Sequence, residues 1–178
     1  MCTVFTTIFF ARGDTGAGLL SQHVRRSVAG ITVTFAREKG KARNWDFRTM
    51  VIPPGSVPGL EPLLAKWELS RGPVLGDRSY YLLPGERTRG AFPPKQVDVW
   101  LREILDHLQV APPPGELWSG HSLRKGAASG ANAIGVTLVI ICYAGGWAVA
   151  SKAVHDYVDP TCPASAAARR LFGWLLPG

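Results

Sequence analysis

Four residues in the last third of the chain have types and a spacing that suit chemistry on a phosphate group. His121 and Arg124 are three positions apart. Trp147 follows a Gly-Gly pair, and Tyr157 comes ten residues after it. Residues three apart share one face of a helix, so His121 and Arg124 can point into one pocket. Arginine offers a planar fork of donors to phosphate oxygens, histidine can carry a proton near neutral pH, and a tyrosine hydroxyl becomes a nucleophile beside a positive charge or a base.

Each of these residues also has an ordinary structural explanation. His-x-x-Arg can be the exposed first turn of a helix, and a lone tyrosine is usually a core or surface residue. The run between Lys125 and Lys152 carries no charge, so a membrane span is an alternative. Only 136–143 is strongly apolar, however, which is too short to cross a bilayer. Gly135 and the Gly145-Gly146 pair predict helix ends on either side, so we expect short helices in a protein core.

Composition and length favour one basic globular domain. The chain has 178 residues, a net charge of +7 and an isoelectric point near 9.7. That balance favours an anionic partner, with nucleic acid first, although solubility alone could also explain it. The three cysteines are widely spaced and odd in number, so they predict neither a disulfide framework nor a metal site. They suit a reducing compartment.

The order of the candidate residues resembles the catalytic domain of the tyrosine recombinases of the phage-integrase type. That family has an arginine near the domain start, a lysine in a β-hairpin, His-x-x-Arg, a His or Trp after glycine, and a tyrosine on a following helix. The segment 12–24, RGDTGAGLLSQHV, resembles the start of that domain, with Leu19, His23 and Val24 in register. The resemblance implies six active-site residues: Arg12, Lys39, His121, Arg124, Trp147 and Tyr157.

The lysine falls in a basic turn between two predicted strands. The segment 31–35, ITVTF, alternates apolar and polar residues, and 48–53 predicts a returning strand that ends at two prolines. A third strand near 25–29 would complete an antiparallel sheet. Lys39 fits the hairpin lysine best, with Lys41 as the alternative. We expect the neighbouring cations to contact the DNA backbone; these residues are Arg37, Lys41, Arg43 and, on the later helix, Lys125.

Helical patterns account for most of the remaining chain. We expect a buried helix at 4–11 and further helices at 60–69, 96–109 and 164–176. His107, on the third of these, is expected at the surface rather than in a site. The predicted fold is therefore α+β, mostly α-helical, with a small three-stranded antiparallel sheet near the N-terminus. Residues 1–178 are expected to form a single catalytic domain, from which the family's N-terminal clamp (core-binding) domain is absent.

The resemblance implies cleavage and rejoining of double-stranded DNA through a 3′-phosphotyrosyl intermediate, as in site-specific recombination and integration. It implies no metal and no cofactor, and it allows a homo-oligomer on DNA formed through the C-terminal helix. Three alternatives stay open: a non-catalytic DNA-binding remnant of a mobile-element recombinase, a type IB topoisomerase-like activity, and a small membrane protein. We expect a nuclear protein in a eukaryote and a cytoplasmic one otherwise, and not a secreted protein.

Overall fold

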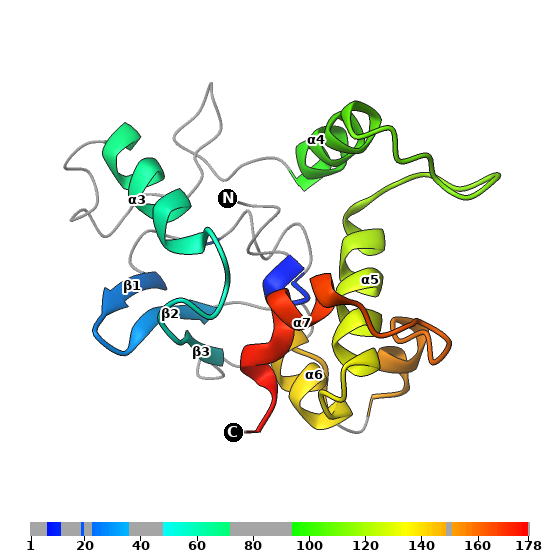
Figure 1. Cartoon of the computed structure of the whole chain (residues 1–178). Helices are drawn as coiled ribbons and strands as arrows, with labels where there is room; N and C mark the ends of the chain where they lie inside the picture. The colour runs from blue at the N-terminus through cyan, green and yellow to red at the C-terminus, as the bar shows by residue number, and fades with distance from the viewer. Residues whose placement is uncertain are drawn as a thin grey trace.

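The computed structural model describes residues 7–11, 19, 23–35, 48–71, 94–148 and 151–177. Three strands come first, and helices follow them (Figure 1). The strands are β1 (Val24–Ser27), β2 (Gly30–Phe35) and β3 (Arg48–Ile52). The α-helices are α3 (Leu60–Arg71), α4 (Pro94–His107), α5 (Gly120–Ala133), α6 (Leu138–Gly145) and α7 (Ala166–Phe172), and the 3-10 helices are η3 (Lys152–Asp156) and η4 (Gly173–Leu175). The predicted class, α+β and mostly helical with an early three-stranded sheet, is confirmed.

The sheet is antiparallel with strand order β1-β2-β3. The alternating pattern that predicted β2 buries Ile31, Val33 and Phe35, because successive side chains point to opposite faces of a strand. The strand predicted near 25–29 is β1, which begins and ends earlier, at Val24 and Ser27. Its turn into β2 ends at Gly30, which has a φ of 119° and where a Cβ atom would overlap the backbone of Ile52.

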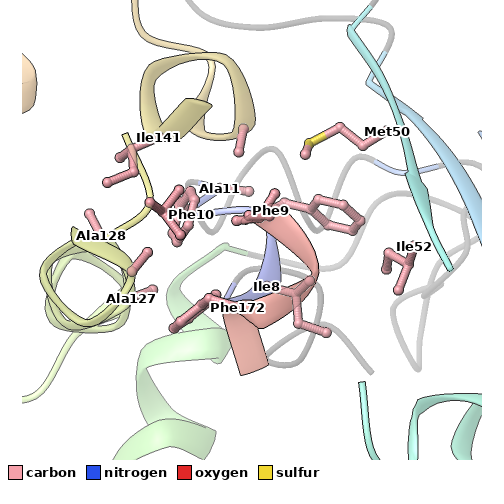
Figure 2. Packing of buried hydrophobic residues seen from close by; sticks show 14 of the residues in the cluster. Ile8, Phe9, Phe10, Ala11, Met50, Ile52, Ala127, Ala128, Ile141 and Phe172 are labelled. Atoms are coloured by element: carbon pink, nitrogen blue, oxygen red, sulfur yellow. The ribbon is translucent and has the colours of Figure 1, made fainter. Parts of the chain in front are cut away.

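The segment at residues 7–11 lies between the sheet and the helices (Figures 1 and 2). Figure 2 places Phe9 on the side of the sheet residues Met50 and Ile52, and Phe10 on the side of α5 and α6. The ring centroids of Phe9 and Phe35 are 5.2 Å apart in an edge-to-face arrangement. This short segment therefore joins the two halves of the core.

The prediction of a buried helix at 4–11 is correct in burial and wrong in extent. Residues 4–6 lie outside the described part of the chain, and helical geometry ends at Ile8. Phe9 and Phe10 form a turn, with Phe10 in the left-handed region at a φ of 48°. A bulky side chain seldom adopts that geometry. In this left-handed conformation, the Phe10 carbonyl accepts a hydrogen bond from Arg124 Nη1.

Three predicted helices form with shifted ends. The helix predicted at 60–69 runs to Arg71, and the one predicted at 96–109 runs from Pro94 to His107. His107 is exposed, as expected. The helix predicted at 164–176 begins at Ala166, because the hydroxyl of Ser165 caps it by accepting the Ala168 N–H, and it tightens into η4 at Gly173.

The uncharged run of the sequence forms two helices, α5 and α6, as predicted. Gly135, with a φ of 96°, lies between them. Gly146, with a φ of 69°, is the left-handed C-cap of α6. Among the described helices, none has both the length and the apolar character needed to cross a membrane.

Candidate active site

Helix α5 carries two of the predicted site residues. Two hydrogen bonds fix its first turn: the N–H of Ser119 donates to Ser122 Oγ at 3.2 Å, and the N–H of Gly120 donates to Asp98 Oδ1 at 2.6 Å. His121 lies in that turn and is exposed to solvent. Arg124, one turn later, points into the protein. The helix therefore presents a histidine at the surface directly above a buried guanidinium.

Arg124 is the centre of the site, and only 2% of its surface is exposed. Its guanidinium carbon lies 3.5 Å from the centroid of the Trp147 ring and 5.3 Å from that of Tyr157. Its Nη1 donates to the backbone carbonyl of Phe10. A buried charge needs such compensation, because leaving water costs several kcal/mol. Aromatic faces and a carbonyl oxygen supply it here.

Trp147 reaches this position through the glycines that end α6. The backbone N–H of Trp147 donates to Cys142 O at 2.9 Å, which satisfies a carbonyl of the last turn of α6. Gly145 has no Cβ, and a Cβ there would overlap the indole ring. The indole is 8% exposed, and its Nε1 has no hydrogen-bond partner among the described residues. Buried donors without a partner are rare in folded proteins, so this indole N–H is a candidate donor to a ligand of the site.

Tyr157 follows the last residue of η3, rather than lying within an α-helix as the resemblance implied. Its N–H donates to Val154 O at 3.0 Å. Its ring centroid is 5.2 Å from that of Trp147 and 6.1 Å from that of His121, with the His121 and Tyr157 rings close to parallel at 26°. The Tyr157 side chain is partly buried.

Four of the six predicted site residues therefore meet, contributed by α5, the end of α6 and the end of η3. The other two, Arg12 and Lys39, lie outside the described residues. So do three of the predicted DNA contacts, Arg37, Lys41 and Arg43, while the fourth, Lys125, is exposed on α5 beside Arg124. The roles of all these residues stay predictions.

Tyr143 lies on the outer face of α6. Its side chain is 53% exposed, although it lies in the most apolar run of the sequence. The reason is the helical period: α6 buries Ile141, Cys142 and Ala144 and turns Tyr143 outward. Its hydroxyl donates to Thr49 O at 3.0 Å. Tyr143 therefore connects α6 to β3, away from the ring contacts of Tyr157.

Arg48 is a positioning residue that the sequence analysis missed. It is buried at the start of β3, with its guanidinium 4.1 Å from the Phe35 ring. Its Nη1 donates to the carbonyls of Tyr143, at 3.1 Å, and Ala144 at the end of α6. This bond ties the sheet to the helix end that carries Trp147. A signal was present, because Arg48, Met50 and Ile52 alternate and so share the inward face of the strand.

Hydrogen bonding and burial shift the pKa values of Asp159, Cys142 and His23. Donation from the Thr161 hydroxyl, at 2.7 Å, and then from its backbone N–H lowers the pKa of Asp159, and Lys125 contributes. Burial raises the pKa of the Cys142 thiol and lowers that of His23. Among the described residues, no three His, Cys, Asp or Glu side chains gather in a way that could hold a metal ion.

Similarity to known proteins is found at the level of structure. No family model and no curated protein sequence matches the chain. Solved structures do match. XerH site-specific recombinase bound to difH substrate, in a pre-cleavage complex, has a TM-score of 0.65 and 16% identity over 89% of this chain. The post-cleavage complex of XerH with palindromic difH has a TM-score of 0.64 and 15% identity over 97%. XerA recombinase has a TM-score of 0.63 and 16% identity over 98%.

The aligned region is a part of each recombinase. It covers 42% and 41% of the XerH chains and 56% of the XerA chain. At this level of identity the similarity establishes the fold alone. The chain thus has a fold like that of tyrosine recombinase catalytic domains, as the resemblance implied.

Proposed function

We propose that this chain, with its tyrosine-recombinase-like fold, cleaves and rejoins DNA strands with Tyr157 as nucleophile. The observation that carries the proposal is the meeting of Tyr157, His121, Arg124 and Trp147 at one point of the fold. These residues come from three elements and span 37 positions of sequence. They combine a nucleophile, a proton-transfer group, a fixed cation and a neutral donor, which are the parts needed for phosphoryl transfer.

In the proposed step, the Tyr157 hydroxyl oxygen bonds to phosphorus and the bond from phosphorus to the 5′ oxygen breaks. The tyrosyl proton passes to His121. The departing 5′ oxygen keeps the bonding electron pair and takes a proton from Lys39. The product is a 3′-phosphotyrosyl bond and a free 5′ hydroxyl. The same steps in reverse rejoin the strand, because the phosphotyrosyl bond keeps the energy of the phosphodiester.

Arg124 and Trp147 would stabilise the negative charge that develops on the non-bridging oxygens. A preorganised donor in a water-poor site is worth far more than the same donor in water. The guanidinium of Arg124 is held by its contacts with Trp147 and Phe10, so it would need little further reorganisation once a phosphate has bound. The Nε1–H of Trp147, which has no acceptor among the described residues, would donate to the same phosphate.

Arg12 would complete the phosphate site. The Phe10 carbonyl contacts Arg124, and Arg12 follows Phe10 by two residues in the sequence. This proximity supports its assignment as the second arginine on the phosphate. The basic residues Arg37, Lys41, Arg43 and Lys125 would contact the DNA backbone, in keeping with the net charge of +7. An assembly through the C-terminal helix stays a prediction; α7 packs on α5 of its own chain.

A second function, DNA binding without cleavage, is favoured by one observation. Arg124 is 2% exposed and donates to a backbone carbonyl, so a phosphate must displace part of this arrangement to reach it. A recombinase remnant could keep Arg124 for stability alone. The two proposals differ in one product, because only the catalytic protein forms a covalent bond to DNA.

The test incubates the chain with short nicked duplexes of randomised sequence and then denatures the mixture in detergent. On a nicked substrate the short cleaved piece diffuses away, which leaves the intermediate trapped. The catalytic proposal predicts a labelled band that survives detergent and heat and is shortened by nuclease. Salt-sensitive binding without that band would instead support the binding protein. Relaxation of supercoiled plasmid without strand exchange would indicate a topoisomerase-like activity.

A further inference from the structure

The loop that carries Tyr157 is held to α5 by a buried serine. The Ser129 hydroxyl donates to Tyr157 O at 3.2 Å and accepts the Asp159 N–H at 2.9 Å. Only 3% of Ser129 is exposed. A serine hydroxyl has one proton to donate and lone pairs to accept with, so both functions are used in this bridge.

We propose that Ser129 is a positioning residue for the tyrosine nucleophile, which holds Tyr157 against the guanidinium of Arg124. This inference rests on the proposed function and adds a residue to its site. Ser129 does not contact the reacting atoms. It acts through the backbone of the residue that does.

The geometry makes α5 a common frame for both partners of the reaction. Arg124 and Ser129 are five residues apart on this helix, about 7.5 Å along its axis. Arg124 supplies the cation, and Ser129 holds the backbone of the residue that carries the hydroxyl. Because both residues belong to one helix, the Ser129 bridge ties the backbone of Tyr157 directly to the element that carries Arg124.

The opposite side of the Tyr157 segment is anchored as well. Val154 is fully buried in the core, and Tyr157 N–H donates to its carbonyl. Beyond Tyr157, the Asp159 carboxylate accepts from the N–H and the hydroxyl of Thr161 and closes a tight turn. Ser129 is the connection from α5 to the segment between these two anchors. Removing the Ser129 hydroxyl deletes both of these hydrogen bonds between α5 and the backbone around Tyr157, and leaves the ring contacts of Tyr157 as the link to α5.

The variant that tests this is Ser129→Ala, which deletes the bridge and little else. Its matched control is Ser165→Ala, which also removes a serine hydroxyl. That hydroxyl accepts the Ala168 N–H at 3.0 Å and caps α7, which packs against α5. Ser129→Thr keeps the hydroxyl and tests rescue. All variants are made in the full chain.

The first measurement is hydrogen exchange at the Asp159 amide, which does not depend on activity. The inference predicts faster exchange in Ser129→Ala than in the unmodified chain or Ser165→Ala, with protection recovered in Ser129→Thr. Equal exchange in all four proteins would overturn the bridge itself and leave the proposed function untouched.

The second measurement is the rate of covalent adduct formation at saturating DNA. Misplacing a nucleophile by about an ångström costs up to a hundredfold in rate, so we expect Ser129→Ala to be slower by roughly 10- to 100-fold. The dissociation constant of Ser129→Ala for DNA should equal that of the unmodified chain. Ser129→Thr should recover the rate of adduct formation to the extent that it recovers protection of the Asp159 amide from exchange. A better leaving group, a 5′ bridging sulfur, should not rescue Ser129→Ala, because the defect lies in attack.

Three outcomes of the second measurement contradict the inference, and they do so in two ways. Unchanged rates in Ser129→Ala, or an equal loss in Ser165→Ala, would overturn the positioning role while the proposed function stands. Absence of any adduct with the unmodified chain would overturn the proposed function and the positioning role with it.

Discussion

The guanidinium of Arg124 is stacked on the indole of Trp147, with its central carbon 3.5 Å from the ring centroid. Arg124 belongs to α5 and Trp147 follows the C-cap of α6, 23 positions later in the sequence. The contact places a permanent cation beside a tryptophan whose ring nitrogen faces no acceptor among the described residues. It also makes the site sensitive to residues that position the indole, and these residues can be tested without a DNA substrate.

Gly145→Ala should displace the Trp147 ring. The added Cβ would overlap the six-membered part of the indole, so the ring or the end of α6 must move. Overpacking of this kind costs about 1–3 kcal/mol of unfolding free energy. Chemical denaturation measures the loss. Gly126→Ala is the control, because its Cβ would meet open space within α5 and alanine favours a helix by up to about 1 kcal/mol. A Gly145→Ala protein as stable as the Gly126→Ala protein would contradict the tight contact.

Arg48→Met should destabilise the junction between sheet and helices. The methionine fills much of the same space but removes the Arg48 donor from the carbonyls of Tyr143 and Ala144. The Tyr143 carbonyl keeps the Gly146 N–H, so the loss falls mainly on Ala144 and costs roughly 1–3 kcal/mol. The control is Arg26→Met. Arg26 pairs with Glu68 at 2.8 Å on the surface, where such a pair is worth at most about 1 kcal/mol. If urea denaturation gives both variants the same midpoint, Arg48 does not hold the end of α6.

Thr161→Val should raise the pKa of Asp159. The Thr161 hydroxyl is the largest cause of the lowered pKa in the unmodified chain, and valine removes it while the backbone donor remains. A carboxylate with a lowered pKa in the folded state adds stability above its unfolded pKa, and this is lost as pH falls through the folded value. The unmodified chain should therefore exceed the variant in stability at neutral pH, by a margin that shrinks under acid conditions. Carboxyl NMR titration measures the pKa directly, and identical values in both proteins would refute the assignment.

Local patterns predicted much of this fold. Alternation located β2, the two prolines marked the end of β3, and Gly135 and Gly146 marked the ends of their helices, because these features depend on neighbouring residues. Helix ends were less accurate. The helix at Ala166 begins where the Ser165 hydroxyl caps it, and the helical turn after Thr7 ends where Phe10 adopts a left-handed conformation beside Arg124.

The site was predictable only as far as its motif extends. Spacing and resemblance selected His121, Arg124, Trp147 and Tyr157, and the fold brings these four together. Ser129 was not selected, because a serine among alanines and glycines has no pattern of its own, and its bond to Tyr157 spans 28 positions. Arg48 acts across 95 positions in the same way. Contacts at such separations depend on how elements pack, which a local pattern does not contain.

The central claim is that Tyr157 bonds covalently to DNA, and a comparison of two tyrosines tests it. Tyr157→Phe and Tyr143→Phe each remove one hydroxyl, worth about 1 kcal/mol or less in stability, so both proteins should fold. Tyr143 is the control because its hydroxyl bonds to Thr49 O, outside the cluster around Arg124.

The decisive measurement is the yield of detergent-resistant adduct on nicked duplexes, with the modified peptide identified by mass spectrometry. The account predicts adduct on Tyr157 in the unmodified and Tyr143→Phe proteins, and none with Tyr157→Phe, which should still bind DNA in a salt-sensitive way. Adduct formation by Tyr157→Phe, or a nucleotide attached to another residue in the unmodified protein, would contradict it.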